Sequence, residues 1–170
     1  MAFSSDGWRE SFDSAHGGCG SAVSEDNPRV FVPPPLIFGG LLALGLIIDR
    51  GPASSTIQLL AVACGLTGLG LIGTALGVFR TNRTRPEPWQ PASALVAGGI
   101  YRFTRNPMYL GMALVCLGVA LHFASIPAAV LTLLAVLIID RTVIRREEAY
   151  LLRRFGDDYR VYQSKVRRWL

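Results

Sequence analysis

The apolar residues of this chain are gathered into long runs that contain no charged side chain. No Asp, Glu, Lys or Arg occurs between residues 51 and 79, and none occurs between residues 106 and 139. A helix needs about 20 consecutive apolar residues to cross a bilayer, and both runs exceed that length. The pattern therefore predicts an all-α, polytopic transmembrane protein.

Turn-forming residues divide these two runs, together with a shorter uncharged run over residues 30–48, into about four spans. The second span is the clearest, at about 35 Å for an uninterrupted helix. The 33 uncharged residues from Pro107 onward would measure roughly 50 Å as one helix, so we expect the chain to fold back near His122, Ser125 and Pro127. His122 at this bend is expected to be an interfacial turn residue rather than a catalytic base. The predicted spans are residues 30–48, 57–79, 107–123 and 126–143.

Small residues recur along the second predicted span. Four of them are spaced at multiples of four, which lets a neighbouring helix approach closely: Ala61, Gly65, Gly73 and Gly77. Three glycines from Gly68 onward spell GxGxxG, but no predicted strand precedes them, so a nucleotide-binding loop is not expected. The small residues predict a packing face, used either within the chain or in a homo-oligomer.

The composition agrees with a membrane protein and excludes a disulfide framework. Hydrophobic residues make up 51% of the chain and charged residues 17%, with a mean hydropathy of +0.37, whereas soluble domains carry about 25% charged residues. The 3 cysteines form neither an even set nor a CxxC spacing. No metal site is expected.

The net charge of +5 comes from basic residues that lie beside the spans. Residues 80–106 carry five Arg, and the region after residue 139 carries nine Lys or Arg. This placement favours topology signals and contacts with anionic lipid over nucleic-acid binding. Segments 80–106 and 144–170 are predicted to be cytoplasmic, as are both termini. Residues 1–29 are expected to form a disordered tail, and residues 30–170 a single membrane domain.

Polar residues flank the uncharged hairpin on both sides. Arg105 and Asn106 stand where the chain enters the third span, and Tyr109 lies just inside it. Polar groups at that depth need protein partners or a ligand. Glu147 and Glu148 follow the fourth span among several arginines. This pair either forms solvated ion pairs along a helix or belongs to a functional site.

The C-terminal region predicts a pair of amphipathic helices lying on the cytoplasmic surface. Apolar residues near helical spacing indicate the first helix: Val143, Ile144, Tyr150, Leu151 and Phe155. Gly156 is typical of a helix stop, and Asp157 and Asp158 can begin a second helix that bears Tyr159 and Tyr162.

Two sequence stretches carry a family resemblance. LVAGGIYRFTRNPMYLG, followed about 30 residues later by REEAYLLRRFGDDYRVYQSKVRRWL, closely resembles the membrane methyltransferase superfamily of isoprenylcysteine carboxyl methyltransferases and phospholipid N-methyltransferases. The resemblance covers residues 95–170. It departs from the carboxyl methyltransferases at Asn106, where those enzymes usually have His.

The resemblance implies an S-adenosylmethionine-dependent enzyme, with the cofactor pocket between the last two spans, the preceding loop and the C-terminal helices. It assigns catalytic roles to Arg105, Glu147 and Glu148. It assigns cofactor-binding roles to Tyr101, Asn106, Pro107, Tyr109, Gly111 and Tyr159, of which Tyr101, Tyr109 and Gly111 fit helix packing equally well. Arg105 can clamp a carboxylate, and a glutamate can stabilise a cation or accept a proton. Asn106 cannot titrate near neutral pH, which assigns it a positioning role.

The implied function is methyl transfer to a lipophilic or membrane-partitioned acceptor, namely a carboxylate, an amine or a thiol. Asn106 in place of His disfavours a prenylcysteine carboxylate. The alternative from another class is a non-catalytic membrane interaction protein that uses the face from Ala61 to Gly77. A sterol-type reductase is a weaker alternative, because the chain is short for one and has no additional nucleotide-binding segment.

Overall fold

The computed structural model describes residues 32–81 and 95–170. The described residues form helices and contain no strand, which confirms the all-α prediction for this part of the chain. The predicted tail over residues 1–29, the start of the first span at residue 30 and residues 82–94 of the first polar segment lie outside it. The elements are α2 (Pro34–Ile48), α3 (Ser55–Thr81), η1 (Gly99–Arg102), α4 (Pro107–His122), α5 (Ile126–Ile139), η2 (Asp140–Ile144) and α6 (Arg145–Lys165).

Proline and serine set where the apolar helices begin. Proline occupies one of the first two positions of α2, α4 and α5, where its missing N–H removes a donor that would have no partner in the helix. Ser125 caps α5 by accepting a hydrogen bond from the Ala128 N–H at 3.2 Å. Its hydroxyl also donates to the carbonyl of Asp49 at 2.5 Å. The predicted bend near Ser125 is confirmed, and it also ties the hairpin to the end of α2.

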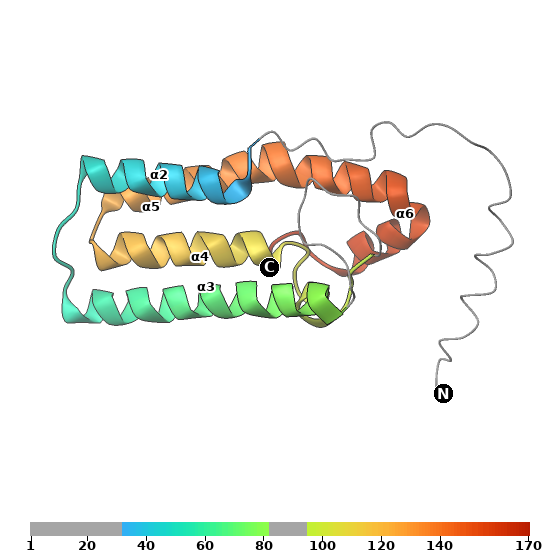
Figure 1. Cartoon of the computed structure of the whole chain (residues 1–170), viewed down its shortest axis with the longest axis horizontal. Helices are drawn as coiled ribbons and strands as arrows, with labels where there is room; N and C mark the ends of the chain where they lie inside the picture. The colour runs from blue at the N-terminus through green and yellow to red at the C-terminus, as the bar shows by residue number, and fades with distance from the viewer. Residues whose placement is uncertain (1–31, 82–94) are drawn as a thin grey trace, which may run out of the picture.

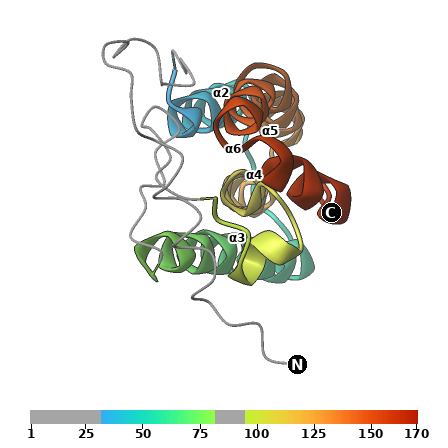
Figure 2. The same cartoon turned by 90° about the vertical axis from the view of Figure 1, so that its right-hand side faces the viewer.

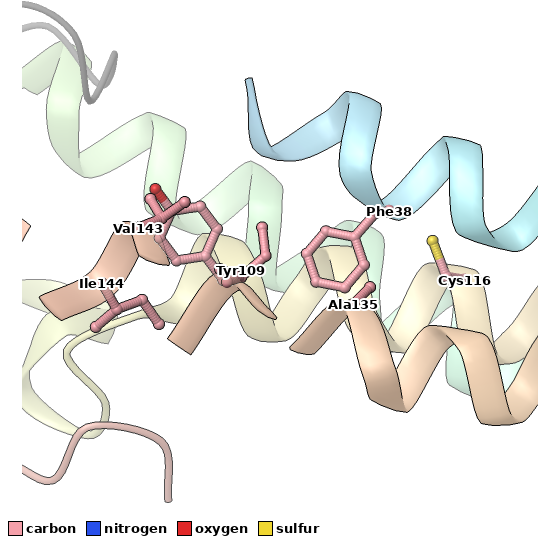
Figure 3. Close-up of a cluster of buried hydrophobic side chains, with 7 residues drawn as sticks. Phe38, Tyr109, Cys116, Ala135, Val143 and Ile144 are labelled. Carbon is pink, nitrogen blue, oxygen red and sulfur yellow. The ribbon is translucent and has the colours of Figure 1, made fainter. Parts of the chain in front are cut away.

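The four apolar helices run alongside one another, with α4 in the centre. Figure 1 shows α2 beside α5, with α4 between this pair and α3. The view turned by 90° shows the same order (Figure 2). A buried cluster joins α2, α4, α5 and η2 and includes Phe38, Tyr109, Ala135 and Val143. Figure 3 shows the ring of Phe38 directed from α2 toward Ala135 on α5.

Helices α3 and α4 pack through residues that have almost no side chain. An ideal Cβ on Gly68 would lie 2.6 Å from the carbonyl oxygen of Gly111, and one on Gly118 would lie 2.8 Å from that of Ala61. The buried residues of α3 are Ala61, Gly68 and Ala75, seven positions apart. A Cβ on Gly73 would meet nothing described within 4 Å. The predicted small-residue face therefore contacts α4 only in part, and its use in a homo-oligomer stays a prediction.

Two helices are long and apolar enough to cross a membrane. They are Ser55–Thr81 and the helix Ile126–Lys165, which combines α5, η2 and α6 and whose first part is apolar. Helices α2 and α4 are apolar but shorter, at 15 and 16 residues. Large apolar side chains point outward, among them Ile47 at 80% exposed and Leu59 at 75%. The described residues therefore contain two candidate membrane spans and two shorter apolar helices.

The C-terminal helix differs from the predicted surface pair in one respect. Its first half is a direct continuation of α5, because Ile139 and Arg145 on either side of the π-helical turn η2 keep helical dihedral angles. No helix breaker occurs before Gly156, whose φ of 53° and ψ of −123° interrupt α6. The predicted stop at Gly156 is confirmed, and the second half of α6 turns back toward the start of α4 (Figure 1).

The close approach of α3 and α4 predicts opposite effects for two Gly→Ala substitutions. Gly68→Ala should destabilise the fold by about 1–3 kcal/mol, because its Cβ collides with backbone atoms. Gly73→Ala, the matched control, should stabilise it by up to about 1 kcal/mol through higher helix propensity. Thermal unfolding in detergent measures both. Equal effects would contradict the observed helix contact.

Candidate functional site

The segment that leads into α4 is fastened to residues 167–168. The Arg105 N–H donates to the carbonyl of Arg167 at 3.0 Å. The Asn106 Nδ2 donates to the carbonyl of Arg168 at 3.0 Å, and the Thr104 hydroxyl donates to the same carbonyl at 3.2 Å. These bonds fix the backbone from which the Arg105 side chain projects.

The carboxylate of Glu148 lies between two guanidinium groups. The Nη1 of Arg105 is 3.2 Å from Glu148 Oε1, and both side chains are 13% exposed. From the other side, Arg168 donates through Nε to Oε1 at 3.0 Å and through Nη2 to Oε2. Two positively charged side chains therefore contact the same carboxylate.

The adjacent carboxyl group, Glu147, has a different environment. Its Oε1 accepts a hydrogen bond from the Tyr109 hydroxyl at 2.7 Å. Burial raises the pKa of Glu147 to about 7, and the Tyr109 hydrogen bond opposes this rise while the charge of Glu148 adds to it. A carboxyl group whose pKa lies near neutral pH can take part in proton transfer.

Two tyrosines of α6 contact Arg105 and η1. Tyr159 is 2% exposed and forms side-chain hydrogen bonds with Gln163 and Arg105. Burial raises the pKa of Tyr159 to about 12, so its hydroxyl stays protonated at neutral pH. The Tyr162 hydroxyl donates to the carbonyl of Tyr101 at 2.7 Å. The second half of α6 is thereby held against η1.

The structure brings five of the predicted site residues together: Arg105, Tyr109, Glu147, Glu148 and Tyr159. The other four predicted site residues make contacts that hold the helices and the loop before α4 in place. Tyr101 packs edge-on against Phe79, with ring centroids 5.5 Å apart. Asn106 binds the Arg168 carbonyl, and Pro107 begins α4. Gly111 faces α3, because its ideal Cβ would lie 2.7 Å from the carbonyl oxygen of Gly68.

Sequence reasoning missed Asp140 and Arg168. Arg168 Nη1 lies 3.3 Å from Asp140 Oδ1, and the indole N–H of Trp169 donates to the same oxygen at 3.1 Å. Asp140 is the first charged residue after the uncharged run, and a carboxylate at the edge of an apolar span needs a partner. The position of Asp140 could therefore have marked it as a paired residue. Nothing in the sequence distinguishes Arg168 from the other basic residues of the C-terminal region.

The sequence profile of the phospholipid methyltransferase family matches residues 46–158, well over half of the chain. The chain belongs to this family. Its members are membrane methyltransferases that use S-adenosylmethionine as the methyl donor. The predicted resemblance is confirmed.

Two relatives illustrate the similarity. An uncharacterized protein of Haemophilus influenzae is 43% identical over 63 residues, which are 37% of this chain and 100% of that protein. The protein-S-isoprenylcysteine O-methyltransferase of Schizosaccharomyces pombe is 36% identical over 72 residues, which are 42% of this chain and 30% of that enzyme. This chain therefore aligns with less than a third of the yeast enzyme's length. No solved structure matches.

The Tyr109 contact predicts how the pKa of Glu147 responds to substitution. Tyr109→Phe removes the hydrogen bond to the carboxylate, so the pKa should rise above about 7 by roughly one unit. An infrared titration of the protonated carboxyl band measures this shift, and the band is assigned by its loss in Glu147→Gln. Tyr162→Phe is the control, because that hydroxyl binds a backbone carbonyl. An unchanged titration in Tyr109→Phe would contradict the contact.

Proposed function

We propose that this protein is a membrane methyltransferase that binds S-adenosylmethionine at Arg105 and Glu147. One observation supports this assignment above the others. The Nε and Nη1 of Arg105 are buried, and neither has a hydrogen-bond partner among the residues that the structure describes. Leaving buried donors unsatisfied costs about 1–3 kcal/mol each, so such groups in a folded protein call for an explanation.

A carboxylate ligand supplies that explanation. A guanidinium presents its N–H groups as a planar fork, which matches the two oxygens of a carboxylate. The ion pair with Glu148 does not use this capacity, because its 3.2 Å contact lacks hydrogen-bond alignment. The methionyl carboxylate of S-adenosylmethionine has the charge and shape that Arg105 can bind.

Glu147 complements Arg105 with the opposite charge. S-adenosylmethionine carries an ammonium and a sulfonium group beside its carboxylate, and an ionised Glu147 stabilises either cation. When bound, the cofactor supplies a methyl group on an electrophilic sulfonium. Methyl transfer of this kind depends chiefly on positioning, and the hydrogen bond from Tyr109 orients Glu147. With a pKa of about 7, Glu147 can also accept the proton that an amine or thiol acceptor releases.

We further propose that all four apolar helices span the bilayer, with both termini cytoplasmic. Helices α2 and α4 measure about 22–24 Å at 1.5 Å per residue, which suits a locally thinned bilayer. The end of α3 with Arg80, η1 with Arg102, and α6 with its arginines lie at the same end of the bundle (Figure 1), in accordance with the positive-inside rule. A lipophilic acceptor, whether a carboxylate, an amine or a thiol, would reach the site from the membrane.

The proposed clamp predicts the donor affinity of two variants. Arg105→Lys keeps the charge but loses the planar fork, so the affinity for labelled S-adenosylmethionine should fall about ten- to hundred-fold. Arg167→Lys is the control, because its side chain is exposed and only its backbone carbonyl touches the site. Equilibrium binding to the purified protein tests both. No binding by the parent protein would favour the non-catalytic alternative.

The topology predicts which introduced cysteines are accessible from outside the cell. In a background without Cys19, Cys64 and Cys116, Ser54→Cys should react with an impermeant thiol reagent on whole cells. Ser164→Cys should react only after the cells are opened. Both serines are exposed on the protein, so exposure alone does not separate them. External labelling at position 164 would overturn the orientation.

A further inference from the structure

We infer that Arg168 is a positioning residue that keeps the Glu148 carboxylate out of hydrogen-bond alignment with Arg105 and thereby keeps the Arg105 donors available for the methionyl carboxylate. This inference rests on the proposed function. It assigns a task to a residue that does not itself touch the donor. This role affects the binding of the methionyl carboxylate, and it is separate from any contribution of Arg168 to the stability of the fold.

The geometry at Glu148 supports this division. Both carboxylate oxygens accept hydrogen bonds from Arg168, one from Nε and one from Nη2. This is the bidentate arrangement that arginine and carboxylate prefer. Arg105 is within ion-pair distance of Glu148 at 3.2 Å, yet its Nη1 and Nε make no hydrogen bond to a described residue. Of the two arginines, Arg168 alone has the aligned contact.

A second carboxylate holds Arg168 from behind. Its Nη1 lies 3.3 Å from Asp140 Oδ1, and Trp169 donates to the same oxygen. The backbone carbonyl of Arg168 also accepts hydrogen bonds from Thr104 and Asn106 on either side of Arg105. The residue is thus fixed at its backbone and at both ends of its guanidinium, so it can hold Glu148 in one orientation.

Without Arg168, Glu148 would still have Arg105 as an ion-pair partner at 3.2 Å. Rotation of the carboxylate would give Arg105 a bidentate pair, which would satisfy the two donors that are otherwise directed to the ligand. The donor's carboxylate would then have to compete with Glu148. The binding of a donor that lacks this carboxylate would be affected much less.

The test compares S-adenosylmethionine with its decarboxylated analogue. In the parent protein, we expect S-adenosylmethionine to bind about ten- to hundred-fold more tightly, as charged hydrogen bonds of typical strength imply. In Arg168→Gln, the ratio of the two dissociation constants should fall toward one. In Arg168→Lys, which keeps the charge and loses only the fork, the ratio should fall by a smaller factor.

Two further variants separate positioning from general loosening. Gly118→Ala disturbs the contact of α4 with Ala61 on α3 and touches no member of the charged cluster, so it should lower thermal stability and leave the ratio unchanged. The double variant Arg168→Gln with Glu148→Gln also removes the Glu148 carboxylate, which would otherwise compete with the ligand for Arg105. The ratio of the two dissociation constants should therefore be well above that of Arg168→Gln alone.

The outcomes distinguish the inference from the function on which it rests. A parent protein that binds neither compound overturns the proposed function. A parent that binds both equally overturns the carboxylate clamp and the role of Arg168, while donor binding stands. A parent with the expected ratio, together with an Arg168→Gln variant in which both affinities fall by the same factor, overturns the inference alone.

Discussion

The carboxylate of Glu148 joins three parts of the chain that are distant in sequence. Through Arg105 it reaches the start of α4, through Arg168 it reaches the last residues, and its own backbone belongs to α6. A largely buried ion pair of this kind costs about 3–5 kcal/mol to break when one partner is removed, because the remaining charge is left without compensation. Arg168 also contacts Asp140 and the Thr104–Asn106 segment, and Trp169 contacts Asp140, so these residues are all connected to the ion pair.

Two consecutive glutamates acquire different properties because they sit on a helix. Successive residues of an α-helix point in directions about 100° apart, so Glu148 faces the arginines while Glu147 faces Tyr109 on α4. The first environment pairs the carboxylate of Glu148 with two guanidinium groups, whereas the second raises the pKa of Glu147 to about 7. One dipeptide thus provides an anchor for two arginines and a group that titrates near neutral pH.

Much of this architecture was predictable from the sequence, because the bilayer imposes strong rules on composition. The uncharged runs and the prolines located the four apolar helices, and Gly156 located the break in α6. The small-residue face was only partly correct: a spacing of four drifts around a straight helix, whereas the buried positions Ala61, Gly68 and Ala75 are seven apart. The ion pairs of Asp140 and Arg168 were missed, because basic residues placed for topology and those placed for a site have the same sequence signature.

The hairpin of α4 and α5 has a mechanical consequence. Arg105 and Tyr109 stand at the open end of one arm, and Glu147 and Glu148 stand beyond the open end of the other, while the arms join through the short turn from Phe123 to Ser125. Any change in the angle between the arms therefore produces its largest displacement at the open end, where the Tyr109–Glu147 and Arg105–Glu148 contacts connect the arms. A movement of α4 against α5 would therefore strain the charged contacts at the open end while it left the turn at Phe123 to Ser125 almost unchanged.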